Sequence, residues 1–438
     1  MIREQKRQAH YHAYSNWYMQ QTWGWSNWYR TEGHKVTPLF NRPNLISATT
    51  KAISKNQVVT AMLVADQSLN KLQQFIVHEL LSPQGQFLLN EALNLKGKLN
   101  GEEALALEVE NAKKIESAFK NNKEIGNWLI LADICYWYGA FCLGFVFRQQ
   151  AERLAHVIKI QVSCSPQKLE QAFRWALDLG DFERAEQSLS FLSKSINSQK
   201  HSQQQAYMAL LQGQPEAIQL QMGIFKNQKL LIKGPAPQDL TISEDIQQTS
   251  DWCLTFNHQP EQNLVTHSNY QASLYNAHDW RRLKAMKLTE KVLDQLDACF
   301  VRRPIAELTN NLLRHKMYYC ENINNIMIQK SFNAAPAAIL EGLRQGAKQV
   351  SICGIDFFLS KDLHKAEYRA GYQKPTTNSY LNKIKPMIIN HDLFSQRRWC
   401  QQIKSKGLLL TDLSATHALA LSEQDYSFAL SKNCKEDI

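Results

Sequence analysis

The stretch ILEGLRQGAKQVSICGIDFF, residues 339–358, decides the fold of this 438-residue chain. Apolar side chains recur on one helical face between residues 336 and 345, and Gly346 is a natural helix stop. The apolar, β-branched run Gln349–Cys353 that follows predicts a strand, which ends at Gly354. A helix that leads straight into a strand is typical of an α/β domain.

The same alternation continues on both sides of this stretch. Further strands are predicted at Lys229–Lys233, Trp252–Phe256, Ala298–Val301 and Gly407–Thr411, with helical stretches between them. Residues 408–410 are three consecutive leucines, as expected for a parallel strand covered on both faces. The second half of the chain is therefore predicted to be an α/β domain with a mostly parallel sheet.

We expect three segments along the chain. Residues 226–438 form the α/β domain, and residues 51–225 form an all-α domain, since apolar residues recur there at helical spacing. Gly144, Gly180 and Gly213 lie 36 and 33 residues apart, close to the period of tetratricopeptide-like (TPR-like) helical hairpins. Residues 1–50 form an arm rich in Trp and Tyr, which either packs onto the next domain or offers a surface to sugar or to a membrane interface.

Composition limits the class of partner. A formal net charge of +10 favours anionic partners, but the Lys and Arg residues are scattered, so no nucleic acid partner is expected. The nine cysteines include no C-x-x-C pair and are expected to be mostly small buried hydrophobes. The apolar run at residues 127–147 is interpreted as a buried helical pair rather than a membrane span, since it contains Asp133 and two glycines. With no signal peptide apparent, we expect a cytoplasmic protein, with peripheral association at the inner membrane as an alternative.

Ligands bind beyond the carboxyl ends of the strands in parallel sheets, so the loops at those positions are candidate sites. Gly234 and Pro235 follow the first strand, and Asn257 follows the second. Glycine permits close approach of a ligand to the backbone, and an asparagine amide can bind a ribose, base or phosphate. Each of these residues could equally serve a turn.

Two more loops carry polar candidates. Gly354-Ile355-Asp356 follows the strand Gln349–Cys353, and Asp356 can accept hydrogen bonds either from a ligand hydroxyl or from its own loop as an Asx-turn. His391 lies in a polar segment before the last helix–strand pair. A lone histidine is more often structural, but histidine is also the usual general base near neutral pH.

Several motifs are absent from the sequence. No D-x-D occurs, so the carboxylate pair with which many sugar-nucleotide enzymes hold a divalent cation is missing. The P-loop, the dinucleotide fingerprint G-x-G-x-x-G and the nucleophile elbow G-x-S-x-G are missing too. These absences count against kinase, dehydrogenase and serine hydrolase functions.

Taken in order, these loops resemble the bacterial sialyltransferases of glycosyltransferase family 42 and, more loosely, the CMP-nonulosonate and CMP-Kdo transferases. The stretch at 339–358 is similar to the family's helix, strand and G-I-D-F segment. LLIKGPAP and WCLTFN resemble its first two strands with their loops, and INHD with GLLLTDLS resembles its I-x-H segment and last strand. The resemblance covers residues 228–420.

The resemblance implies a Rossmann-like, GT-A-type (sialyltransferase-like) domain. It further implies an inverting, metal-independent transfer of an acidic sugar from a CMP-sugar donor to a glycan acceptor. His391 would be the base, and no cofactor would be needed beyond the donor. Residues that correspond to the nucleotide site are Gly234, Pro235, Asn257, Asn333, Gly354, Ile355 and Asp356.

The sequence also departs from the family pattern. Asn333-Ala334-Ala335 replaces T-S-G, and Phe358 replaces a tyrosine, so hydroxyl groups that would bind the phosphate are lost. His364 and Lys330 are the residues that could serve instead. The donor can therefore be a sialic acid, Kdo or another ulosonate. A non-catalytic CMP-sugar-binding scaffold, or a protein-glycosylating enzyme whose helical half holds a protein or membrane-surface partner, remains an alternative.

Overall fold

The computed structural model describes residues 81–94, 125–236, 249–261, 268–302, 316–361 and 379–435, apart from residues 162, 194, 195, 197, 322, 324, 325, 329 and 331. It also describes residues 106, 110, 111, 114, 115 and 117. The predicted aromatic arm at residues 1–50 and the candidate His364 lie outside the described residues.

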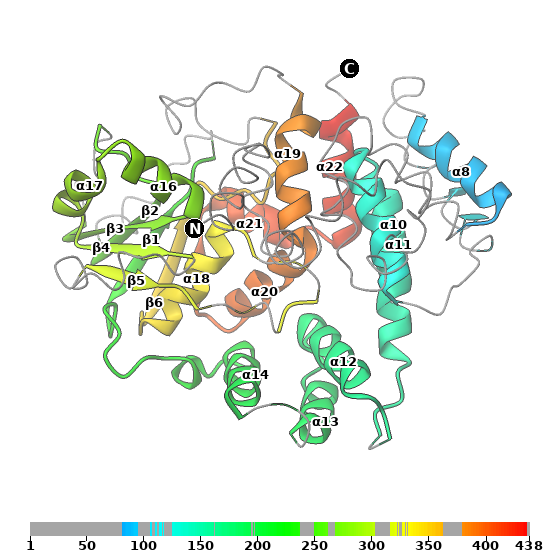
Figure 1. Ribbon diagram of the computed structural model, residues 1–438, viewed down its shortest axis with the longest axis horizontal. Helices are drawn as coiled ribbons and strands as arrows, with labels where there is room; N and C mark the ends of the chain where they lie inside the picture. The colour runs from blue at the N-terminus through cyan, green and yellow to red at the C-terminus, as the bar shows by residue number, and fades with distance from the viewer. Residues whose placement is uncertain are drawn as a thin grey trace, which may run out of the picture. The chain divides into compact units, whose positions relative to one another are not determined.

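The described helices and strands are labelled as in Figure 1. The strands are β1 (Lys229–Lys233), β2 (Trp252–Phe256), β3 (Tyr270–Tyr275), β4 (Ala298–Val301), β5 (Met317–Tyr319), β6 (Gln349–Cys353) and β7 (Leu409–Thr411). The earlier helices are α8 (Pro83–Asn94), α10 (Ile125–Trp137), α11 (Phe141–His156), α12 (Pro166–Leu179), α13 (Phe182–Leu192), α14 (Ser198–Leu211) and the 3-10 turn η2 (Pro215–Ala217). The later helices are α16 (Ala277–Ala285), α17 (Thr289–Gln295), α18 (Ala334–Arg344), α19 (Tyr380–Asn390), α20 (Leu393–Ser405), α21 (Leu413–Ala420) and α22 (Glu423–Lys435).

The chain forms two compact units. One comprises Met1–Ala155, Thr376–Asn390 and Glu423–Ile438, and the other comprises His156–Pro375 and His391–Ser422. The second unit contains the whole sheet together with helices α12 to α14. The units thus group the chain differently from the three expected segments, which stay a prediction.

Within the described residues, the sheet of the second unit has seven strands in the order β5-β4-β3-β2-β1-β6-β7, and every pair of neighbours is parallel. The prediction of an α/β fold with a parallel sheet is confirmed. Leu230, Leu231 and Ile232 of the interior strand β1 are all buried, as a strand covered on both faces requires. The strand order is compatible with a Rossmann-like fold.

Helices cover the two faces of the sheet at different places. Gly342 of α18 lies against Leu230 and Val350 so closely that an added Cβ would meet the Leu230 Cδ2 atom at 2.5 Å. The pairing register places Leu230, Trp252 and Tyr270 on this face, so Tyr275 and Cys299 point to the other one. That opposite face carries α16 and α17 at the β3–β5 end of the sheet.

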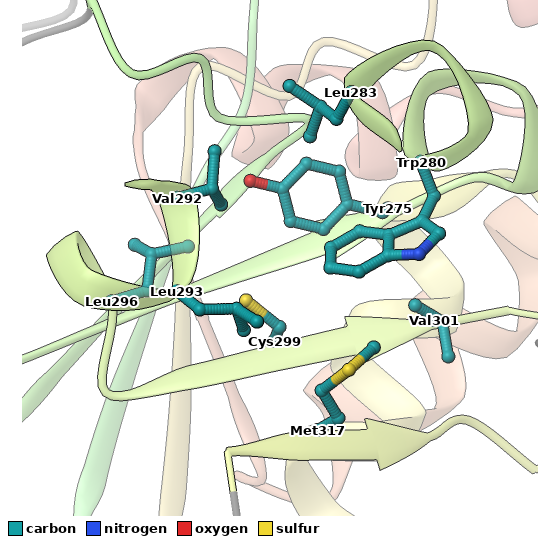
Figure 2. Packing of buried hydrophobic residues seen from close by; sticks show 9 residues of the cluster. All are labelled: Tyr275, Trp280, Leu283, Val292, Leu293, Leu296, Cys299, Val301 and Met317. Carbon is teal, nitrogen blue, oxygen red and sulfur yellow. The ribbon is translucent and has the colours of Figure 1, made fainter. Parts of the chain in front are cut away.

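Figure 2 shows the apolar cluster beneath α16 and α17. The Tyr275 ring lies edge-on to the Trp280 indole, with ring centroids 5.2 Å apart. Val292, Leu293 and Leu296 cover the strand residues from α17 and its end. Such a cluster holds the exits of β3 and β4 in fixed positions, because close-packed cores do not deform continuously.

The first unit confirms the interpretation of residues 127–147 as a buried helical pair. Helix α10 ends at Trp137, and Gly139, with φ of +77°, turns the chain into α11. The Ser431 hydroxyl of α22 accepts hydrogen bonds from the Phe141 and Cys142 N–H groups, at 2.9 and 3.2 Å, which satisfies the start of α11. No helix in the described residues is of sufficient length and apolarity to span a membrane.

The helical repeat is not supported. Gly180 and Gly213 follow helices in left-handed conformations, with φ of +74° and +100°. Gly144, the third glycine of the predicted repeat, lies inside α11 against the Tyr136 ring. The regular spacing of the three glycines therefore does not correspond to a repeated structure. All nine cysteines are free thiols and eight are buried, as the sequence predicted for most of them.

Candidate functional site

The candidate site lies at the carboxyl ends of β1 and β6. From β1 the chain adds β2, β3, β4 and β5 in sequence on one side, then returns to place β6 and β7 on the other. Adjacent parallel strands whose connections run in opposite directions mark a topological switch point, the usual ligand-binding position of such sheets. Gly234 and Gly354 follow the two strands at this point.

The two glycine loops are bonded to each other through their backbones. The Gly234 N–H donates to the Cys353 carbonyl at 2.7 Å, and the Ala236 N–H donates to the Gly354 carbonyl at 3.0 Å. A Cβ atom at Gly234 would lie 2.1 Å from the Gly354 carbonyl oxygen, so only glycine fits there. Gly354 has φ of +60°, a conformation that glycine adopts without steric cost.

Asp412 anchors the β6 loop, and the sequence analysis missed it. Its Oδ2 atom accepts the Gly354 N–H at 2.8 Å, while its Oδ1 atom accepts the Ala415 N–H at 2.8 Å and caps α21. The signal was present in the sequence, because an Asp that directly follows a strand is a strong N-cap candidate. The sequence gives no signal for the hydrogen bond between Asp412 and Gly354, which are 58 residues apart.

Asp356 closes its own loop. Its carboxylate accepts the Phe358 N–H at 3.0 Å and the Ser360 N–H at 2.9 Å, which is the Asx-turn alternative considered from the sequence. Phe357 and Phe358 both have positive φ, of 51° and 69°. Because non-glycine residues rarely adopt this region, the carboxylate bonds hold a strained turn beside Gly354.

We predict a pH-dependent effect of Asp356→Asn. Burial raises the pKa of Asp356 above its ordinary value of 3.8, so the folded state holds the proton to a higher pH than the unfolded chain does. Wild-type protein should therefore lose stability as the pH rises from 3.8 through the raised pKa, and the amide variant should lose less. Urea unfolding across this range measures the difference. Parallel stability curves for the two proteins would contradict the assignment.

The loop after β2 is fixed by hydrogen bonds with residues at the end of β3. Asn257, with φ of +52°, accepts the Asn276 N–H through its side-chain oxygen at 3.2 Å. The next residue, His258, is buried, and its carbonyl accepts the Tyr275 hydroxyl at 2.8 Å. Its Nε2 atom lies 3.1 Å from the Gln295 side-chain oxygen, and burial lowers its pKa. The cluster of Figure 2 thus fixes the Asn257 loop through Tyr275.

Asn333 lies at the start of α18 and His391 directly before α20, and a hydrogen bond joins the starts of these two helices. Asn333 caps α18, accepting the Ala334 N–H at 2.7 Å, and its own N–H donates to the Gln396 side-chain oxygen in the first turn of α20 at 3.0 Å. His391 is partly exposed and directly precedes Asp392, the N-cap of α20. Since α18 and α20 lead into the amino ends of β6 and β7, both begin at the same edge as the glycine loops. Lys330 is partly buried shortly before Asn333.

The chain matches no family model, no curated protein and no solved structure. Within the described residues, no group of three or more His, Cys, Asp and Glu side chains could hold a metal ion.

Helix starts at the carboxyl edge of the sheet are candidate anion sites. Helices α18, α20 and α21 all begin there, and the first helical N–H groups carry partial positive charge. Asp392 and Asp412 cap two of these helices with carboxylates, whereas α18 has the uncharged cap Asn333 and no acidic residue in its first turn. These three helix starts share one edge with the loops that carry Gly234, Asn257 and Gly354, and α18 alone of the three lacks an acidic cap.

Proposed function

We propose that this protein is a metal-independent, inverting glycosyltransferase that uses a CMP-sugar donor. The observation that carries the proposal is the pair of glycine loops bonded to each other at the switch point between β1 and β6, the usual ligand-binding position of such sheets. A nucleotide that lies across this point meets backbone atoms rather than side chains. The order of the loops along the chain, and their resemblance to sialyltransferases, selects CMP among nucleotides.

The chemistry of the edge supports a CMP leaving group. One phosphate ester needs a few hydrogen-bond donors rather than a divalent cation, and helix starts with backbone N–H groups provide such donors. The sequence contains no D-x-D pair. Lys330 and the start of α18 are the groups that we assign to the phosphate.

His391 is assigned as the general base. Its imidazole takes the proton of an acceptor hydroxyl while the oxygen attacks the anomeric carbon, and the bond from that carbon to the CMP phosphate oxygen breaks. CMP leaves with the bonding electrons, and the anomeric centre inverts. His391 is partly exposed. The acidic sugar is a sialic acid, Kdo or a related ulosonate, and the acceptor is a surface glycan.

A second candidate function is supported by the hydrogen bonds of three site residues. The polar side chains of Asp356, Asn333 and Asn257 each accept a backbone N–H of a nearby loop or helix start. A protein that binds a CMP-sugar without turning it over, or that uses the fold as a scaffold, would show the same bonds.

Calorimetry with CMP tests the proposed function. We expect CMP to bind equally well in EDTA and in Mg²⁺, since no metal bridges its phosphate to the protein. UMP and AMP serve as controls for the base and should bind more weakly. Absence of heat with CMP and with CMP-sugars would overturn the proposal and favour the scaffold.

A further inference from the structure

Arg302 places a guanidinium group beside the start of α18. It is the first residue after β4, and its backbone N–H donates to the Tyr275 carbonyl at 3.3 Å. Its Nη2 atom donates to the carbonyl of Phe332, the residue directly before the α18 cap Asn333. The side chain therefore extends from β4 toward the helix that packs on β1 and β6.

The Arg302 charge is not balanced by a carboxylate in the described part of the chain. The two nearby acids have other partners: Glu341 accepts from Arg344 Nε at 2.9 Å and from Gln345 Nε2 at 2.8 Å, and Glu321 accepts the Tyr207 hydroxyl at 2.7 Å. The neighbouring Cys320 thiol is neutral, since burial raises its pKa well above the ordinary value. Burial likewise lowers the pKa of Arg302, which nevertheless stays charged near neutral pH.

A partly buried cation is costly when, as for Arg302 among the described residues, no carboxylate pairs with it, because little compensates for its lost hydration. The neighbouring helix start adds to the positive potential, since α18 has neither an acidic cap nor an acidic first turn. The Arg302 charge and the positive end of α18 both lower the stability of the protein without ligand. Both interact favourably with a bound anion. A planar guanidinium matches a carboxylate in geometry and can bind it through two parallel hydrogen bonds.

We propose that Arg302 binds the carboxylate of the donor's acidic sugar. The inference rests on the proposed function, because the ligand is taken to be a CMP-ulosonate. In such donors the carboxylate and the phosphate ester are attached to the same anomeric carbon. A carboxylate site must therefore lie next to the phosphate site, and residue 332 is next to Asn333 in the sequence. Arg302 makes the protein selective for acidic over neutral sugars.

Titration of the full chain with three probes tests the assignment. CMP is compared with CMP-N-acetylneuraminate and CMP-Kdo, and the tighter-binding donor is compared with its carboxylate methyl ester, all without acceptor. Charge-assisted hydrogen bonds predict that the free acid binds at least about tenfold more tightly than its ester. Arg302→Gln should remove this preference and lower the affinity for CMP much less than the affinity for the free-acid donor.

Two further variants are controls that distinguish loss of the carboxylate contact from misfolding. Arg302→Lys keeps the charge and should keep part of the preference. Arg344→Gln breaks the ion pair with Glu341, 2.7 Å long, at the other end of α18, and should leave the preference intact. CMP binding by each variant reports that its site is folded.

The outcomes separate the inference from the proposed function. If wild-type protein does not bind CMP, the proposed function fails and the inference fails with it. If CMP binds but the acid and its ester bind alike, or Arg302→Gln keeps the preference, only the Arg302 assignment is overturned. Equal loss of affinity for CMP and for the donor in Arg302→Gln would also overturn it, since the contact would then be to phosphate.

Discussion

Replacing His391 with alanine is expected to lower the rate of sugar transfer by about 10²- to 10⁴-fold, the usual contribution of a general base. The affinity for CMP should not change, because the imidazole is assigned to the acceptor hydroxyl and not to the nucleotide. The fold should tolerate the change, since His391 is partly exposed and the cap of α20 is made by Asp392, which accepts the Ser395 N–H at 3.0 Å.

Release of CMP from a CMP-sugar in the presence of acceptor measures this effect. His417→Ala is the matched control, since His417 is exposed on α21 of the same unit and has no assigned role. That variant should transfer sugar at the wild-type rate. A His391→Ala protein that remains fully active would remove the base assignment and leave the nucleotide site unaffected.

Gly234→Ala is expected to abolish CMP binding and to destabilise the fold by about 1–3 kcal/mol, as overpacking in a close-packed position usually does. The new Cβ would lie 2.1 Å from the Gly354 carbonyl oxygen and 2.4 Å from Ile355 Cγ1. The Gly354 carbonyl cannot move away without breaking the hydrogen bond that it accepts from the Ala236 N–H. The two loops must therefore separate, and the edge on which we place the nucleotide changes shape.

Gly407→Ala provides the control for this variant. Gly407 has φ of +73°, and an added Cβ would meet nothing within 4 Å, so the substitution introduces backbone strain without a clash. It should be destabilising but should bind CMP normally. Chemical unfolding and calorimetry on the three proteins measure both quantities. Normal CMP affinity in Gly234→Ala would show that the nucleotide does not depend on this point of the sheet.

Much of the sheet is predictable from the sequence. Four strands have the predicted bounds, and β7 begins two residues later than expected, at Leu409. Two strands were missed. β3 alternates Gln271 and Ser273 with apolar residues and so lacks the continuous apolar run of its neighbours, although both polar side chains are buried. β5 has only three residues, too few for any periodicity to show.

The candidate site was less predictable. Gly234 and Gly354 could be found from the sequence, because each directly follows an apolar run that predicts a strand. The partners of these residues depend on strand order, which no local pattern encodes. The bonds of Gly354 with Asp412, and of Arg302 with Phe332, connect residues brought together only by the completed sheet.

The central claim is that a cytidine monophosphate group lies across the carboxyl ends of β1 and β6. A crystal structure of the protein with CMP bound tests it most directly. We predict electron density for the nucleotide against the Gly234 and Gly354 loops, with its phosphate directed toward the start of α18. Density for the nucleotide at the amino edge of the sheet, or in the first unit, would contradict the account.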